Sequence, residues 1–246
     1  MVKKEYIQNI ISKYNLDGNV ETVKWEIKDN TIIIKFISNN KDLVGIVTAS
    51  ELDIKKCDLA IFDTQKLLKL ISIMGDNIMF EPIKEGSTFA ALLMDDKKYD
   101  VSYFLANPLL VPKFPKIEEP KYDFVADLFA PDLLSISKAI SALPDVDNIT
   151  ISSREKISGE NFIEFIIGND DKHSNKIKFN LEPTANIICN GELFSCKYKP
   201  ELMKPILQLN KGSETAKIHL SKEGLMKLEF KETTIDSVYY LIPKEN

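Results

Sequence analysis

Hydrophobic and polar positions alternate in many short runs of this chain. In 176–181, Ile177, Phe179 and Leu181 share one face while Lys178 and Asn180 take the other. A period of two residues indicates a β-strand, and a single apolar face is typical of antiparallel sheet with one side in water. The same reading predicts strands over 31–37, 42–48, 59–62, 77–81, 88–94, 100–105, 148–152, 161–167, 176–181, 216–220, 225–230 and 237–242.

Four segments follow a helical period instead, over 3–14, 64–74, 132–142 and 200–209. In the second of these, Leu67, Ile71 and Met74 align on one stripe. Asp63 is placed to cap it, and Pro131 and Pro200 suit the first turn of the third and fourth helices. Pro205 falls inside the fourth helix and is expected to kink or shorten it. The first helix is expected to begin with no strand before it.

Helices and strands follow each other in a repeated order. The helix at 64–74 precedes three strands ending in Val101-Ser-Tyr-Phe-Leu, and the helix at 200–209 precedes three strands ending in Val238-Tyr-Tyr-Leu-Ile. Two blocks of nearly equal length and the same order indicate a duplicated domain. Between them, four prolines over 107–121 favour an extended connector. Its apolar residues suggest that it lies against a surface of the protein. We expect domains over 1–107 and 122–246, joined by a connector over 108–121.

Composition narrows the class of protein. The chain has 246 residues, 44% of them hydrophobic, and only three cysteines. It has no long uncharged apolar run and no signal-peptide pattern near Met1, so we expect a cytoplasmic protein without a membrane anchor. The net charge of −5 argues against a simple nucleic-acid binder. Arg154 is the one arginine among 32 basic residues, which argues against a sequence-specific DNA reader.

The charge is unevenly distributed along the chain. The four helical segments, with Lys199 included, hold eight lysines and three carboxylates, a balance of +5. Since the whole chain carries −5, the remainder carries −10. For any one helix a solvated lysine face is the simpler interpretation, but four helices with the same sign suggest a basic surface on an acidic body.

Signals for catalysis are poor. His173 lies in a polar turn and His219 is expected to point outward from a strand, so both are interpreted as solvated. The three cysteines form no zinc pattern, and the chain contains no glycine-rich phosphate loop. Asp95-Asp96 and Asp170-Asp171 suit turns better than a metal pair. We expect no enzyme activity, no metal and no cofactor.

Three stretches resemble the DNA sliding clamps, in particular the trimeric clamps of tailed phages and the proliferating cell nuclear antigen of eukaryotes and archaea. The ending Val238-Tyr-Tyr-Leu-Ile-Pro-Lys-Glu245 is similar to that of the eukaryotic clamps. Asp58-Leu-Ala-Ile-Phe-Asp-Thr-Gln-Lys-Leu-Leu-Lys-Leu-Ile-Ser-Ile-Met74 and Phe129-Ala-Pro-Asp-Leu-Leu-Ser-Ile-Ser-Lys-Ala-Ile-Ser-Ala-Leu143 resemble stretches around the second and third helices of the phage clamps. The similarity in the order of helices and strands covers the whole chain. The first helix begins almost at Met1, which is more like the phage clamps than the cellular ones.

The resemblance implies an α+β fold of two clamp domains, each with two helices packed on antiparallel sheets. Three such subunits would close into a homotrimeric ring that encircles duplex DNA without sequence preference, lines its hole with helices and tethers a replicative DNA polymerase. A clamp loader would be a second partner. The lysines that would face DNA are Lys13, Lys66, Lys69, Lys138, Lys204 and Lys211, with Lys3, Lys4 and Lys199 at the margin.

Two further surfaces follow from the resemblance. A hydrophobic pocket under the connector would accept peptides from polymerase and loader. Its lining would be Leu43, Val44, Val111, Phe114, Ile117, Tyr240, Leu241, Ile242 and Pro243; core packing in a last strand is the competing interpretation for the tail. The seam between subunits would pair the edge strand carrying Tyr99, Val101 and Tyr103 with the strand carrying Ile177 and Phe179.

Two alternatives remain open. One is an open, monomeric processivity factor or scaffold of the same fold, held on nucleic acid by charge. It would need a more basic helix face than +5 over four helices. The other is a non-enzymatic viral structural β-protein, which gives no reason for lysines to gather on helices.

Overall fold

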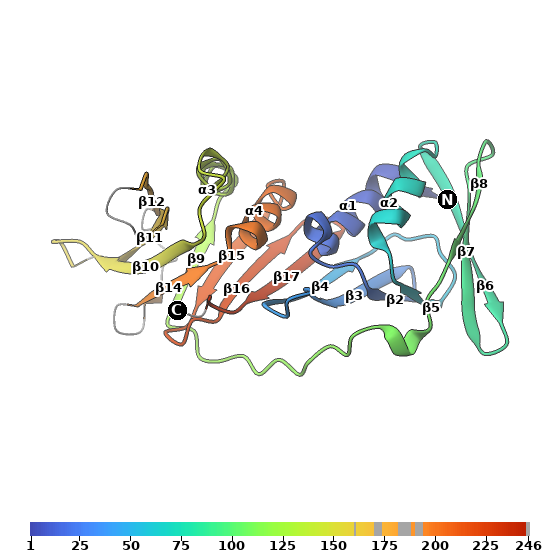
Figure 1. The fold of residues 1–246 in the computed structure, drawn as a ribbon, viewed down its shortest axis with the longest axis horizontal. Coiled ribbons are helices and arrows are strands. Elements are labelled where there is room, and N and C mark those ends of the chain that lie inside the picture. Colours follow the sequence, from blue (N-terminus) through green and yellow to red (C-terminus); the bar gives the residue numbers. More distant parts are fainter. Residues whose placement is uncertain (160, 170–173, 182–187, 190–193, 245–246) are drawn as a thin grey trace. The chain divides into compact units, whose positions relative to one another are not determined.

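The computed structural model describes residues 1–159, 161–169, 174–181, 188–189 and 194–244. The chain divides into two compact units (Figure 1). Unit 1 contains Met1–Lys116 and Thr233–Ser237, and unit 2 contains Ile117–Glu232 and Val238–Asn246. The last strand, β17 (Ile235–Leu241), therefore begins in unit 1 and ends in unit 2.

Unit 1 consists of two helices and two sets of antiparallel strands. One sheet has the order β1-β6-β7-β8, and the other strands follow the order β4-β3-β2-β5. Helices α1 and α2 pack against each other, and α1 also contacts β4. The elements are β1 (Val2–Lys3), α1 (Lys4–Asn15), the 3₁₀ turn η1 (Leu16–Gly18), β2 (Val23–Lys28), β3 (Thr31–Ile37), β4 (Leu43–Ala49), β5 (Cys57–Ile61), α2 (Thr64–Ser72), β6 (Asn77–Glu85), β7 (Thr88–Asp95), β8 (Asp100–Phe104) and the 3₁₀ turn η2 (Pro108–Leu110).

Unit 2 has a similar plan. One sheet has the order β12-β11-β10-β14, and the remaining strands follow the order β13-β9-β15-β16-β17. Helices α3 and α4 pack against each other, and α3 also contacts β11 and β12. The elements are β9 (Phe124–Leu128), α3 (Ala130–Ala142), β10 (Ile149–Glu155), β11 (Asn161–Ile167), β12 (Ile177–Leu181), β13 (Ile188–Cys189), β14 (Ser195–Tyr198), α4 (Pro200–Leu209), β15 (Thr215–Leu220) and β16 (Met226–Lys231).

The helix starts follow from local chemistry. Asp63 accepts a hydrogen bond from the Lys66 backbone N–H at 2.8 Å and so caps α2. At α3 the Asp132 carboxylate accepts from the Phe129 backbone N–H at 2.9 Å. Helix α4 begins at Pro200, where the missing N–H costs nothing. It runs through Pro205 to Leu209, the range expected from the sequence, so Pro205 does not shorten it.

Each unit has an aromatic core. In unit 1 the buried Trp25 indole donates to the Tyr14 hydroxyl, with 3.3 Å between Nε1 and the oxygen. In unit 2 the buried Tyr198 hydroxyl donates to the Gly224 carbonyl at 2.9 Å, and Phe230 packs edge-on against Tyr239. Both hydroxyls are hydrogen-bonded, which offsets the cost of burying them.

The structure extends the predicted strand set and corrects its start. Strand β1 precedes the first helix and pairs Val2 with Ile78, contrary to expectation. Four further described strands lie where none was predicted: β2, β9, β13 and β14. Strands β2 and β9 alternate cleanly, with Val23, Trp25 and Ile27 buried in β2, so the period-two rule was sufficient to find these two.

Candidate nucleic-acid and partner surfaces

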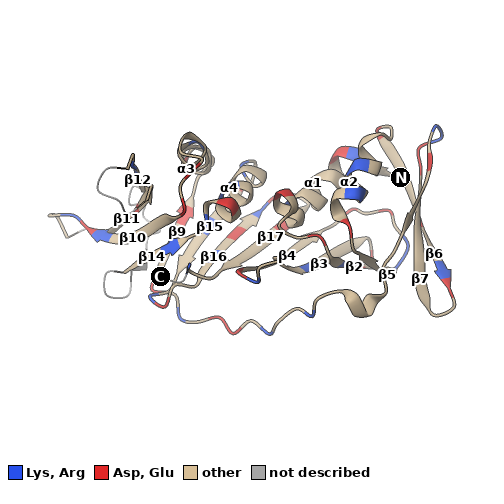
Figure 2. Cartoon of the chain, viewed as in Figure 1, with Lys and Arg blue, Asp and Glu red and all other residues tan. Residues whose placement is uncertain are grey.

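Helix α2 presents the most basic exposed face among the described helices. Lys66 and Lys69 are both exposed, and α2 contains no acidic residue (Figure 2). Leu67 and Ile71 are buried on the opposite side of the helix. The stripe that anchors α2 therefore leaves its two ammonium groups in water, where they can contact phosphate as point charges.

Lys13 corrects the predicted lysine set, because its side chain has no exposed surface. The last turn of α1 is buried on several sides, with Tyr14, Asn15 and the following Leu16 also enclosed. The helical wheel placed Lys13 opposite the apolar stripe, but a wheel assumes that only one side of a helix is covered. Lys13 is not available to contact DNA in this structure.

The remaining lysines differ in exposure. Lys138 on α3 and Lys211 after α4 are exposed, whereas Lys204 on α4 is half-buried. Lys4 donates from Nζ to the Met74 carbonyl at 2.7 Å, which ties α1 to the end of α2. Lys3 and Lys199 precede the helices. The observed helices thus hold six lysines and three carboxylates, a balance of +3, below the +5 expected from the sequence.

The two strands predicted to meet between subunits both lie at sheet edges. Among the described strands, β8 pairs only with β7, and β12 pairs only with β11. Tyr99 precedes β8 and is exposed, while Val101, Ile177 and Phe179 are half-buried. An edge strand offers a row of unpaired backbone groups that another chain can pair with.

Tyr103 corrects the predicted seam. Its side chain is only 2% exposed, and its hydroxyl accepts from the Asp63 N–H at 3.2 Å and donates to the Asp63 carbonyl at 3.1 Å. It therefore ties β8 to the start of α2. The next residue, Phe104, faces the other way and is 72% exposed. Alternation along the strand predicts this opposition, so Phe104 was the better candidate for a contact outside the chain.

The end of the connector is held by a charged network within unit 2. Lys227 Nζ lies 2.8 Å from Glu119 Oε1 and 2.7 Å from Glu229 Oε1, and Tyr240 donates to Glu119 at 2.6 Å. Burial opposes ionisation of Lys227, but the hydrogen bonds to both carboxylates outweigh it and raise the pKa of Lys227. The connector is thereby fixed at Glu119.

His219 also belongs to this network, contrary to its interpretation as a solvated side chain. Its Nε2 lies 3.0 Å from Glu229 Oε2, and its ring packs against Tyr122 with 5.1 Å between centroids. Burial lowers the pKa of His219, and the neighbouring Glu229 only partly offsets that effect. The partner was missed because the strand register, which sets His219 opposite Lys227 and diagonal to Glu229, is not visible in one strand alone.

The residues predicted to line a peptide pocket fall in both units and differ in exposure. Leu43 and Leu241 are each 1% exposed, so neither can line an open surface; both alternate into the core beside an outward neighbour. Tyr240 is nearly buried, and Ile242 is 52% exposed. The half-buried remainder is Val44, Val111, Phe114, Ile117 and Pro243.

The described residues contain no group of three or more His, Cys, Asp or Glu side chains that could hold a metal ion. No helix in the described part of the chain has the length and apolar character needed to cross a membrane. His173 and Asp170-Asp171 lie outside the described residues.

Comparison with known proteins identifies the fold. No protein-family model matches the sequence, and no curated protein matches it. Among solved structures, the chain is similar to the proliferating cellular nuclear antigen of Entamoeba histolytica, with a TM-score of 0.73 at 17% sequence identity. The match covers 99% of this chain and 96% of that chain. The α+β clamp fold expected from the sequence is therefore confirmed, with two helices per unit on antiparallel sheets.

Proposed function

We propose that this protein is a DNA sliding clamp, a processivity factor that encircles duplex DNA and tethers a replicative polymerase. The observation that carries the proposal is the fold similarity, which extends over both units and 99% of the chain. A fold hosts many functions, so the proposal also needs surfaces suited to ring closure and to DNA.

Ring closure is supported by two of the edge strands among the described residues, β8 in unit 1 and β12 in unit 2. These edges are different surfaces of one chain, so pairing β8 of one subunit with β12 of the next is a head-to-tail contact. Such a contact closes into a ring when the rotation per subunit permits, and we propose a homotrimer. Val101, Ile177 and Phe179 would lie at this seam, and closure would cover both edges.

DNA contact is supported by the exposed lysines Lys66, Lys69, Lys138 and Lys211, with Lys204 partly accessible. Lysine ammonium groups bind phosphate without reading bases, as sliding requires. Retention would come from topology, so the net charge of −5 does not oppose this role. The protein would act without catalysis. Polymerase and clamp loader would be its protein partners, and Val44 and Phe114 in unit 1 would serve as docking residues.

A monomer held on DNA by charge alone is less well supported. That alternative requires a strongly basic helix face, but the described helices carry a balance of only +3 and bury Lys13. A viral structural role gives no account of the lysines on α2.

The experiment that tests the proposal uses linear duplex DNA with biotin at both ends. The protein is allowed to thread onto the DNA, streptavidin is added to block the ends, and the complex is washed in high salt, which screens direct contacts. A clamp stays bound and is released when a restriction enzyme cuts the DNA. Light scattering should give a trimer. Release by salt with the ends still blocked, or a monomer at all concentrations, would contradict the proposal.

A further inference from the structure

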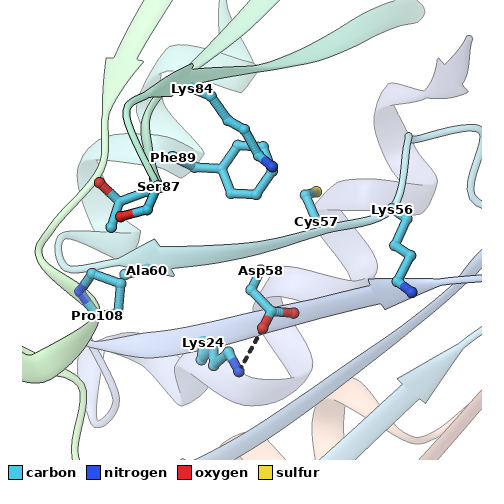
Figure 3. Close-up of a pocket in the computed structure, with 10 residues that line it drawn as sticks. Lys24, Lys56, Cys57, Asp58, Ala60, Lys84, Ser87, Phe89 and Pro108 are labelled. Atoms are coloured by element: carbon cyan, nitrogen blue, oxygen red, sulfur yellow. Dashed lines mark ion pairs between the residues drawn. The ribbon is translucent and has the colours of Figure 1, made fainter.

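Unit 1 contains a cavity of about 520 Å³ that none of the surfaces above includes. It lies between β5, the neighbouring β2, the hairpin that joins β6 to β7, and the start of the connector (Figure 3). Pro108 and Lys56 lie at opposite ends of the view, with Phe89 and Lys84 above β5. The cavity is therefore a groove that follows a strand.

The strand that forms the floor of the groove has a free edge. Among the described strands, β5 pairs only with β2. The Ala60 carbonyl accepts from the Ala106 backbone N–H at 2.9 Å, so the backbone of Ala60 points away from β2. In an antiparallel ladder residues two apart point the same way, so the N–H and C=O of Asp58 also point to the free edge. Among the described residues, the edge is occupied at Ala60 and open at Asp58.

The walls of the groove carry positive charge. Three lysines line it against one carboxylate, Asp58. Lys24 is neutralised locally, because its Nζ lies 2.9 Å from Asp58 and 3.1 Å from Glu26. The exposed ammonium groups of Lys56 and Lys84 remain available for a ligand, with Lys84 held 4.9 Å above the Phe89 ring. Phe89 and Pro108 add apolar surface.

We propose that this groove binds an extended, acidic segment of a partner protein, which adds to β5 as a further strand. Backbone pairing at Asp58 would supply affinity, and acidic side chains would meet Lys56 and Lys84. A strand satisfies both the donor and the acceptor of Asp58, whereas a DNA backbone offers acceptors only. The inference does not rest on the clamp function.

Binding of a short fluorescent peptide in which Glu alternates with Val tests the proposal by fluorescence anisotropy with the full chain. We expect Lys56→Glu combined with Lys84→Glu to weaken binding about tenfold. The matched control is Lys28→Glu with Lys98→Glu, two exposed lysines of unit 1 outside the groove, which should change the affinity less than about twofold. Circular dichroism of both variants checks that they are folded.

A second peptide separates strand addition from simple charge attraction. Methylation of alternate backbone nitrogens removes the pairing donors and keeps the charges, so this peptide should bind about tenfold more weakly. Equal binding of the methylated peptide, or of a peptide in which Lys replaces Glu, would overturn the proposal. The absence of peptide binding would also overturn it. A further contradicting result would be that ATP or duplex DNA displaces the peptide from the wild type but not from the Lys56→Glu, Lys84→Glu variant.

Discussion

The helix pairs of the two units are built alike and charged differently. In unit 1, α2 exposes Lys66 and Lys69 and contains no carboxylate. Its counterpart in unit 2, α4, has a half-buried Lys204 and an exposed Glu201. Both helices bury an apolar stripe, formed by Leu67 and Ile71 in α2 and by Leu202 and Ile206 in α4. Packing therefore constrains one side of each helix, and the solvent side is free to carry different charge.

The same contrast exists within unit 1. Lys13 and Lys66 both lie opposite an apolar stripe on a helical wheel, but Lys13 is enclosed and Lys66 is in water. A buried ammonium must be compensated by the protein around it, whereas an exposed one is solvated. The two lysines should consequently respond to mutation in opposite ways.

The largest effect is expected at Lys13. Lys13→Glu places a carboxylate in a fully enclosed site and should lower the free energy of unfolding by about 3–5 kcal/mol. Lys66→Glu, at an exposed site, should change it by less than about 0.5 kcal/mol. Urea denaturation followed through the single Trp25 measures both variants. Equal stability of the two variants would mean that Lys13 is not enclosed in solution.

Lys13 also marks the limit of what could be predicted from the sequence. The four helices and most strands follow from periodicity, because each has one face in a core and one outside. Burial of a helix on several sides depends on which elements pack around its last turn, and no local pattern records that. The same holds for Tyr103, whose hydroxyl reaches Asp63 across 40 residues of chain.

Contacts between residues on neighbouring strands were the second feature that could not be predicted from the sequence. Glu229 lies beside His219 because β15 and β16 pair in one register, and a shift by one residue would separate them. The lysines of the groove come from β2, the residue before β5, and β6, so their convergence is a property of topology. The residue types can be read from the sequence, but which residues lie beside one another can be known only from the fold.

The second-largest effect is expected on the affinity for DNA. Lys66→Glu with Lys69→Glu should weaken binding to a linear duplex about tenfold at low salt and reduce the salt dependence by about one phosphate contact per lysine. Lys138→Glu with Lys204→Glu should have a smaller effect, because Lys204 is half-buried. Anisotropy titrations over a range of salt compare the pairs. A larger loss of DNA affinity in the Lys138→Glu, Lys204→Glu variant would mean that the helices of unit 2 contribute more to DNA binding than α2 does.

A third effect distinguishes the starts of α2 and α4. Asp63→Ala removes the side-chain cap of α2 and should cost about 1 kcal/mol, with faster hydrogen exchange at the Lys66 amide. Asp63→Asn retains an acceptor and should cost only a few tenths of a kcal/mol. Amides in the first turn of α4, which starts at Pro200 without a side-chain cap hydrogen bond, should exchange as before. If hydrogen exchange at those α4 amides accelerates equally, the loss of stability is not local to the α2 cap.

The smallest effect is a pH dependence carried by unit 2. Burial lowers the pKa of His219 below its ordinary value of 6.5, so the unfolded chain takes up a proton there more readily than the folded one. The stability from neutral His219 is therefore present above about pH 6.5 and is lost as the pH falls below it.

Of the charged groups facing His219, Glu229 favours the proton, whereas Lys227 and Lys217 oppose it. The pKa of Glu229 is itself held below 4.5, because hydrogen bonds from Lys227 and His219 outweigh its burial, so that carboxylate contributes only at lower pH. His219→Gln should flatten the decline in unfolding free energy between about pH 7 and 5, measured by urea denaturation at each pH. In the wild type, amide exchange should accelerate in β15 and β16 before it does around Trp25. An unchanged slope in His219→Gln would place the acid sensitivity elsewhere in the chain.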